Sequence, residues 1–104
     1  MNLILKALFI CLFTINSIAL TVIDVRTLDE WNSGHLEDAI HKEWQNILDI
    51  SLVVSKDETI YLYCRSGNRS GKAKNILIDN GYKNAINAGS ILEASKLLNR
   101  KIIK

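Results

Sequence analysis

The strongest constraint on the fold is an alternation of short β-prone runs with segments of helical spacing. Residues 20–25 (LTVIDV) and 59–63 (TIYLY) are rich in β-branched and aromatic side chains, which is typical of strands. Residues 70–80 carry apolar side chains at helical intervals, and Gly81 follows where a helix would end. Strands that alternate with helices through short connections predict an α/β domain with a small, mostly parallel central sheet flanked by helices.

Weaker signals extend this alternation over the rest of the chain. Thr27 and Glu30 have the spacing of a capping box, which predicts a short helix that ends at Gly34. A chain of 104 residues has room for one small domain, which we place at 20–104. The other expected elements are a brief strand at 39–40, a helix over 42–50, a short strand within 84–89 and a final helix over 90–104.

Residues 1–19 differ in composition from the rest of the chain. Lys6 is their only charged side chain, and Ser17 and Ala19 supply small residues at the −3 and −1 positions of a cleavage site, as in a secretory signal peptide. A retained membrane anchor is the alternative, but the apolar core is about ten residues long and a spanning helix needs about 20. We therefore expect a cleaved leader and a periplasmic or otherwise exported domain without a stable membrane anchor.

Export makes the cysteine content informative. Cys11 lies in the leader, so Cys64 would be the single cysteine of the mature domain. Exported proteins usually pair their cysteines, and an unpaired thiol in an oxidising compartment is a liability unless it is buried or used. Cys64 is therefore the first candidate for a functional residue.

The segment after the 59–63 strand has the composition of an anion-binding loop. A glycine and short polar residues let several backbone N–H groups point at one spot next to a helix start, where the partial charge is positive. Such a site favours a thiolate and lowers the pKa of a cysteine, and nearby arginines act in the same direction. A cysteine at the end of a strand can instead be a small core residue, but a core residue gains nothing from such a loop. The candidate site is the 64–70 loop: Cys64, Arg65, Ser66, Gly67, Asn68, Arg69 and Ser70.

Three motifs then resemble the rhodanese superfamily in the right order. The loop CRSGNRS is similar to the family's active-site loop. The segment IDVRTLDEWNSGHLEDAIH (23–41) resembles the opening motif, and GYKNAINAGS (81–90) resembles the closing one. Together they cover most of the mature chain and are similar to the small, exported single-domain sulfurtransferases of the family.

The resemblance implies a three-layer rhodanese-like domain and a sulfur-transfer reaction. A Cys64 thiolate would attack the sulfane sulfur of thiosulfate or a similar donor and become a persulfide. Cyanide or a thiol would then accept the sulfur, and neither a metal nor an organic cofactor is implied. Asp24 and Arg26 would lie beside the loop and brace it, Ser70 would cap the helix, and His35 would be structural.

The sequence also departs from the family pattern. Asp38 and Ser90 each replace a common glycine, and His41 stands where the family usually has asparagine. These departures leave the expected fold intact but put the backbone path near residues 38–43 and the rim near Ser90 in doubt.

Two other functions stay open. A sulfur carrier or interaction module would keep a reactive Cys64 without turnover. Cell-cycle phosphatases of the superfamily use Cys-x5-Arg, whereas Cys64 and Arg69 are separated by four residues, which favours sulfur over phosphate. A net charge of +2 from scattered side chains argues against nucleic acid as a partner. We expect a monomer whose partners are a small sulfur-containing anion and an acceptor.

Overall fold

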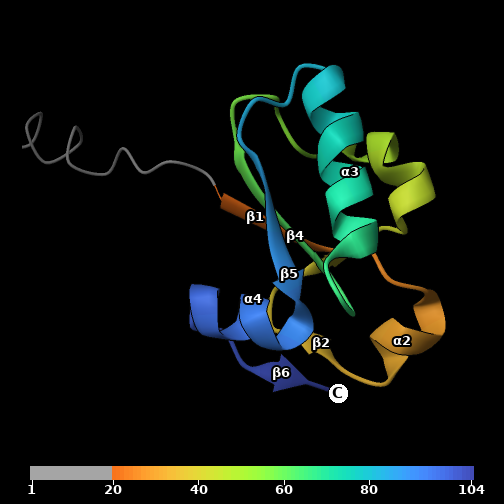
Figure 1. Ribbon diagram of the computed structural model, residues 1–104, viewed down its shortest axis with the longest axis vertical. Helices are drawn as coiled ribbons and strands as arrows, with labels where there is room; N and C mark the ends of the chain where they lie inside the picture. The colour runs from red at the N-terminus through yellow and green to blue at the C-terminus, as the bar shows by residue number, and fades with distance from the viewer. Residues whose placement is uncertain (1–19) are drawn as a thin grey trace, which may run out of the picture.

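The computed structural model describes residues 20–104, and the predicted signal peptide at 1–19 lies outside the described residues (Figure 1). The elements of this part follow one another in short alternation. In chain order they are β1 (Leu20–Asp24), α2 (Leu28–Asn32), β2 (His35–Leu36), β3 (Ile40–His41), the 3₁₀ helix η1 (Trp44–Leu52), β4 (Thr59–Cys64), α3 (Asn68–Asp79), β5 (Ala85–Ser90), α4 (Ile91–Leu98) and β6 (Ile102–Ile103).

The main sheet has four strands in the order β3-β1-β4-β5, and all its neighbouring pairs are parallel. Asp24 at the end of β1 lies opposite Tyr63 of β4, and Cys64 lies opposite Ser90 of β5. A small second sheet pairs β2 with β6 in antiparallel fashion. Because the long strands are parallel, their carboxyl ends bring Asp24 and Cys64 to one edge of the sheet, where ligands bind in open α/β folds.

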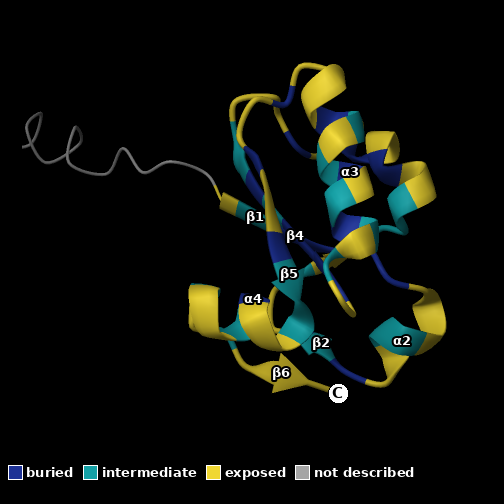
Figure 2. Ribbon diagram, viewed as in Figure 1, coloured by how far each residue is buried: buried dark blue, intermediate teal, exposed yellow. Residues whose placement is uncertain are grey.

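Side chains of β4 alternate between two cores, as the pleat of a strand requires. Ile60, Leu62 and Cys64 belong to the core on one face, and Tyr63 belongs to the core on the other. Helix α3 and η1 cover the first face, and α4 packs against the second (Figure 1). The buried residues run along the strands and the inward sides of the helices (Figure 2). The predicted three-layer α/β class is confirmed.

The helix expected at 42–50 is a 3₁₀ helix over Trp44–Leu52, interrupted by non-helical dihedrals at Asn46. Its inward residues explain the difference. Trp44 packs against the core, Ile47 and Ile50 are buried in it, and Leu48 is exposed. The inward positions are three residues apart, a spacing that a helix with three residues per turn aligns on one face.

The final helix is shorter than expected. It ends at Leu98, because Asn99 adopts a left-handed conformation with φ of 53° and stops the helical hydrogen bonding. The last residues form β6 beside β2, so the prediction of one helix over 90–104 is wrong at its C-terminal end. Across the described part of the chain, every helix is too short or too polar to cross a membrane.

Candidate active site

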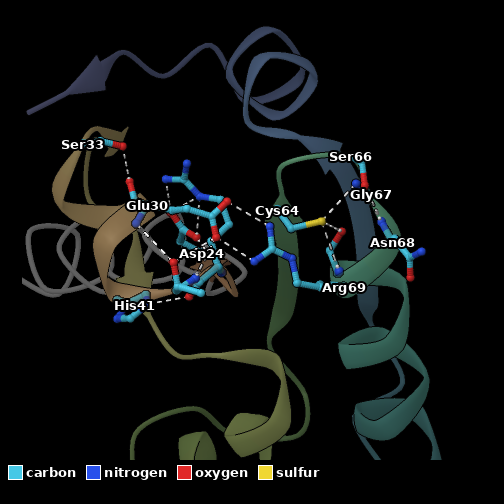
Figure 3. Close-up of polar contacts among 12 residues, drawn as sticks. Asp24, Glu30, Ser33, His41, Cys64, Ser66, Gly67, Asn68 and Arg69 are labelled. Carbon is cyan, nitrogen blue, oxygen red and sulfur yellow. Dashed lines mark hydrogen bonds and ion pairs between the residues drawn. The ribbon is translucent and has the colours of Figure 1, made fainter.

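The loop after β4 folds back over the Cys64 sulfur. The backbone N–H of Gly67 donates to Sγ at 3.0 Å, and the backbone N–H of Ser70 donates at 3.4 Å (Figure 3). The Ser70 hydroxyl also lies 3.4 Å from Sγ. Cys64 is buried with no exposed surface, although Arg65 and Ser66 directly after it are exposed. The loop therefore directs donors at a sheltered sulfur atom.

Helix α3 begins two residues earlier than the spacing predicts, at Asn68. Gly67 precedes it with φ of 93°, a left-handed conformation that costs glycine little and turns its N–H toward Sγ. The prediction that Ser70 caps the helix is wrong, because Ser70 lies inside the first turn and its hydroxyl faces Cys64. The early start places the N–H of Ser70, in the first turn of α3, beside the sulfur together with the N–H of the N-cap residue Gly67.

These contacts set the ionisation of Cys64. Burial opposes formation of the thiolate, but the Ser70 hydroxyl and the backbone N–H groups of Ser70, Ser66 and Gly67 outweigh it, so the pKa of Cys64 lies below its ordinary value. Hydrogen bonds to the charged form favour that form in this way. The arrangement can supply a nucleophilic thiolate.

Arg69 does not point freely toward an incoming anion. Its guanidinium forms a two-pronged ion pair with Glu30 of α2, with Nη1–Oε1 at 2.7 Å and Nη2–Oε2 at 3.0 Å (Figure 3). The hydrogen bond from Arg69 lowers the pKa of Glu30 to about 2, so the carboxylate stays charged at neutral pH. The loop is thus tied to α2, a link between residues 39 positions apart.

Arg65 is the exposed cation of the loop. Within residues 20–104 it has no ion-pair partner, in contrast to Arg69. Asn68 is also exposed, and its N–H makes only a long contact of 3.5 Å to the Ser66 hydroxyl. Of the two loop arginines, Arg65 is the one with donors available to a dissolved anion.

Asp24 and Arg26 form a buried ion pair at the end of β1. Arg26 Nη2 lies 2.6 Å from Asp24 Oδ2 and also 2.6 Å from the carbonyl of Gly34, and Nε bonds both carboxylate oxygens at 3.0 Å. The pair stands next to β4, where the N–H of Val25 bonds the carbonyl of Tyr63. Besides its own backbone, the pair bonds the carbonyl of Gly34, and within residues 20–104 it makes no hydrogen bond to residues 65–70. The pair therefore holds the carboxyl end of β1 rather than the 64–70 loop itself.

The closing segment contributes Asn87, which sequence reasoning missed. Its Oδ1 accepts from the Ser70 hydroxyl at 2.7 Å and from the N–H of Gly89 at 2.9 Å, while its Nδ2 donates to the carbonyl of Gly67 at 2.9 Å. Asn87 lies opposite Leu62 of β4 in regular register, and Leu62 belongs to the core on the α3 face, so Asn87 points to the face that carries Gly67 and Ser70. Strand alternation gives the face of Asn87, but its contacts with Ser70 and Gly67 join residues 17 and 20 positions apart and have no local signal in the sequence.

The histidines of the opening segment are structural. His35 stacks on Trp31 with ring centroids 3.5 Å apart, and its Nδ1 contacts the Trp31 carbonyl, in line with the predicted structural role. His41, which received no role, lies with Nε2 2.7 Å from the carbonyl of Arg26. It therefore fixes the turn that carries the buried Asp24–Arg26 pair.

Two departures from the family pattern have a local physical reason. Asp38 has φ of 62°, a conformation that aspartate tolerates better than most residues that carry a side chain. Ser90 is the N-cap of α4, and it forms a capping box with Glu93. The backbone path around residue 38 and the rim near residue 90 are thus compatible with the family fold.

The sequence of the chain is similar to those of known proteins. Residues 14–94 match the rhodanese-like domain family. The thiosulfate sulfurtransferase PspE of Escherichia coli is 34% identical over 71 residues, which cover 66% of this chain and 68% of that protein. A putative sulfur carrier protein of Bacillus subtilis, YrkF, is 28% identical over 69 residues, and the match spans only 37% of its length.

Solved structures give the same result for the fold. A rhodanese with anions from E. coli superposes with a TM-score of 0.67 at 32% identity, over 72% of this chain and 91% of that one. A rhodanese-like domain protein from Staphylococcus aureus has the same TM-score of 0.67 at 27% identity, over 88% of each chain. Family match, sequence relatives and architecture together support a sulfurtransferase or sulfur-carrier activity, and the chain belongs to the rhodanese-like domain family.

Proposed function

We propose that this protein is an exported sulfurtransferase that moves a sulfane sulfur from thiosulfate, or a similar donor, to a thiol or cyanide through a persulfide on Cys64. The observation that carries the proposal is the set of donors aimed at Sγ, the N–H groups of Gly67 and Ser70 and the Ser70 hydroxyl. The name of the E. coli relative supports thiosulfate as the donor. The composition of residues 1–19 supports export.

In the first half-reaction the Cys64 thiolate attacks the outer sulfur of thiosulfate. A new sulfur–sulfur bond forms to Sγ, the sulfur–sulfur bond of the donor breaks, and sulfite leaves with that electron pair. In the second half-reaction the acceptor attacks the outer sulfur of the persulfide, and Cys64 leaves as the thiolate. The reaction is a double displacement through a covalent intermediate.

The chain supplies electrostatic preorganisation for both steps. The loop amides face the sulfur before any substrate arrives, so no reorganisation is needed when negative charge forms there. Arg65 is available to hold the sulfonate end of the donor, because it is exposed and has donors to spare. Cys64 itself has no exposed surface, so access of a donor to Sγ requires a local movement of the side chains around it.

A sulfur carrier is the second candidate, and its support is the similarity to YrkF. It would use the same Cys64 persulfide and hand the sulfur to one protein partner. A phosphatase is disfavoured by the ion pair between Arg69 and Glu30, which occupies the guanidinium that a phosphate would need. The four-residue spacing between Cys64 and Arg69 argues in the same direction.

Steady-state thiocyanate formation from thiosulfate and cyanide tests the enzyme. We expect turnover in the natural protein and none in Cys64→Ser. A persulfide that forms without turnover would favour the carrier instead. Release of phosphate from an aryl phosphate, lost in Cys64→Ser, would contradict both sulfur functions.

A further inference from the structure

The Ser70 hydroxyl lies between two acceptors and can serve only one of them at a time. Its Oγ is 3.4 Å from Cys64 Sγ and 2.7 Å from Asn87 Oδ1. Ser70 is fully buried, so water does not compete for this group. A hydroxyl carries one proton, and Cys64 and Asn87 therefore compete for it.

The surroundings of Asn87 fix which end of its amide faces Ser70. The carbonyl of Gly67 can only accept, and it lies 2.9 Å from Nδ2. The N–H of Gly89 can only donate, and it lies 2.9 Å from Oδ1. A flipped amide would lose both bonds, so the oxygen must face the Ser70 hydroxyl.

The charge on Sγ decides where the hydroxyl proton goes. A thiol donates its own proton to Ser70 Oγ, and Ser70 then donates to Asn87. A thiolate has no proton to give, and the hydroxyl turns to it because a bond to an ion is stronger than one to a neutral amide. In a persulfide the negative charge lies on the outer sulfur, so Sγ is uncharged and the hydroxyl turns back to Asn87.

We propose that Asn87 is a positioning residue of the sulfur-transfer site, which holds the Ser70 hydroxyl whenever Sγ is uncharged and gives it up to the thiolate. Because Asn87 offers the hydroxyl a partner only when Sγ is uncharged, it stabilises the persulfide of Cys64 relative to the thiolate. The favoured persulfide rests on the proposed sulfur transfer. The competition of Cys64 and Asn87 for the Ser70 hydroxyl requires only the Cys64 thiol. A second task of Asn87 is to anchor the loop through Gly67.

Four proteins separate the two tasks: the natural protein, Asn87→Ala, Ser70→Ala and the double variant. Asn87 is exposed, so its truncation opens no core cavity, and Ser70→Ala is a small change at a buried position. In the Ser70→Ala background, Asn87→Ala reports only the loop anchor, and the difference between backgrounds isolates the hydroxyl. Asn84→Ala is a matched control, because Asn84 is an exposed asparagine beside β5 that bonds Asp57.

The first measurement is the pH dependence of Cys64 alkylation by iodoacetamide. The charged groups around the loop are unchanged in all variants: Arg65, Arg69, Glu30, Asp24 and Arg26. The effect expected is that of one neutral hydrogen bond, so the change that Asn87→Ala makes in the ratio of thiolate to thiol should differ about threefold or more between the two backgrounds. When Ser70 is present, Asn87→Ala should raise the ratio of thiolate to thiol. Equal effects in both backgrounds would overturn the proposal.

The second measurement is the sulfur occupancy of Cys64 at a fixed ratio of thiosulfate to sulfite, read by intact mass at a pH on the alkylation plateau. With Ser70 present, Asn87→Ala should lower the ratio of persulfide to thiolate about threefold, and in the Ser70→Ala background it should not. If Asn87→Ala changes the sulfur occupancy equally with and without Ser70, Asn87 does not favour the persulfide through the Ser70 hydroxyl. If the natural protein takes up no sulfur, the proposed function fails, and the alkylation experiment still decides whether Asn87 competes with Cys64.

Discussion

The ion pair between Glu30 and Arg69 ties the 64–70 loop to α2, and Glu30→Gln tests what it contributes. Glu30 accepts from Arg69 at 2.7 and 3.0 Å, and it also completes the capping box with Thr27. Glutamine serves in a capping box as well as glutamate does. The substitution therefore removes the charge and keeps the cap.

The pKa of Glu30 gives the magnitude. It falls from 4.5 to about 2, mainly through the hydrogen bond from Arg69, and at 1.36 kcal/mol per unit this sets an upper limit of about 3 kcal/mol. The two side chains keep 26% and 28% of their surface exposed, and solvent screening reduces the expected loss in Glu30→Gln to about 1–2 kcal/mol at pH 7. Because the folded-state pKa is lowered, this stability is present above about pH 4.5 and is lost as the pH falls toward 2.

Urea denaturation of both proteins at pH 7 and at about pH 3 measures the difference, which should shrink by more than half at the lower pH. Glu93→Gln is the control, because Glu93 completes the capping box of α4 and has no ion-pair partner within residues 20–104. A difference between Glu30→Gln and the natural protein that is the same at both pH values would refute the reasoning. So would a loss of equal size in Glu93→Gln.

Three further predictions follow from the site. Cys64→Ser should abolish thiocyanate formation and destabilise the domain by about 1 kcal/mol, because a hydroxyl replaces a sulfur in a buried setting; full retention of activity would remove Cys64 from the reaction. Arg65→Ala should raise the KM for thiosulfate about tenfold or more with an unchanged midpoint of urea denaturation, since an exposed charge-assisted contact is lost; an unchanged KM would exclude Arg65 from binding. Asp24→Asn should cost about 3–5 kcal/mol in urea denaturation, because it leaves the buried Arg26 charge uncompensated; a loss below about 1 kcal/mol would show that the pair does not hold the edge of the sheet.

The sequence predicts the fold because its signals are local. The β-branched run over 59–63 and the helical spacing over 70–80 each depend on near neighbours, and their alternation leaves few topologies. The same locality explains the error at 90–104. An apolar pair, Ile102 and Ile103, continues a helical pattern, but the left-handed Asn99 ends the helix and the pair completes a strand beside β2.

Of the candidate site, the sequence predicts the position of Cys64 and the amides around it, since both follow from a strand, a glycine and a helix start. It does not predict the partner of Arg69, because Glu30 is remote in the chain and serves a helix cap at the same time. Nor does it predict the contacts of Asn87, because its partners Ser70 and Gly67 are 17 and 20 positions away in the chain. Contacts that depend on tertiary register are not encoded in a local pattern.

The most direct test of the central claim is intact mass spectrometry, under non-reducing conditions, of the protein recovered from the exported fraction after treatment with thiosulfate. We expect a mass that starts at Leu20 and carries one additional sulfur atom. Cyanide should remove this sulfur, and Cys64→Ser should never acquire it. A protein that stays unmodified in thiosulfate, or an equal sulfur adduct on Cys64→Ser, would contradict the persulfide mechanism. Retention of residues 1–19 would contradict the cleaved leader and leave the sulfur chemistry to be judged by the adduct alone.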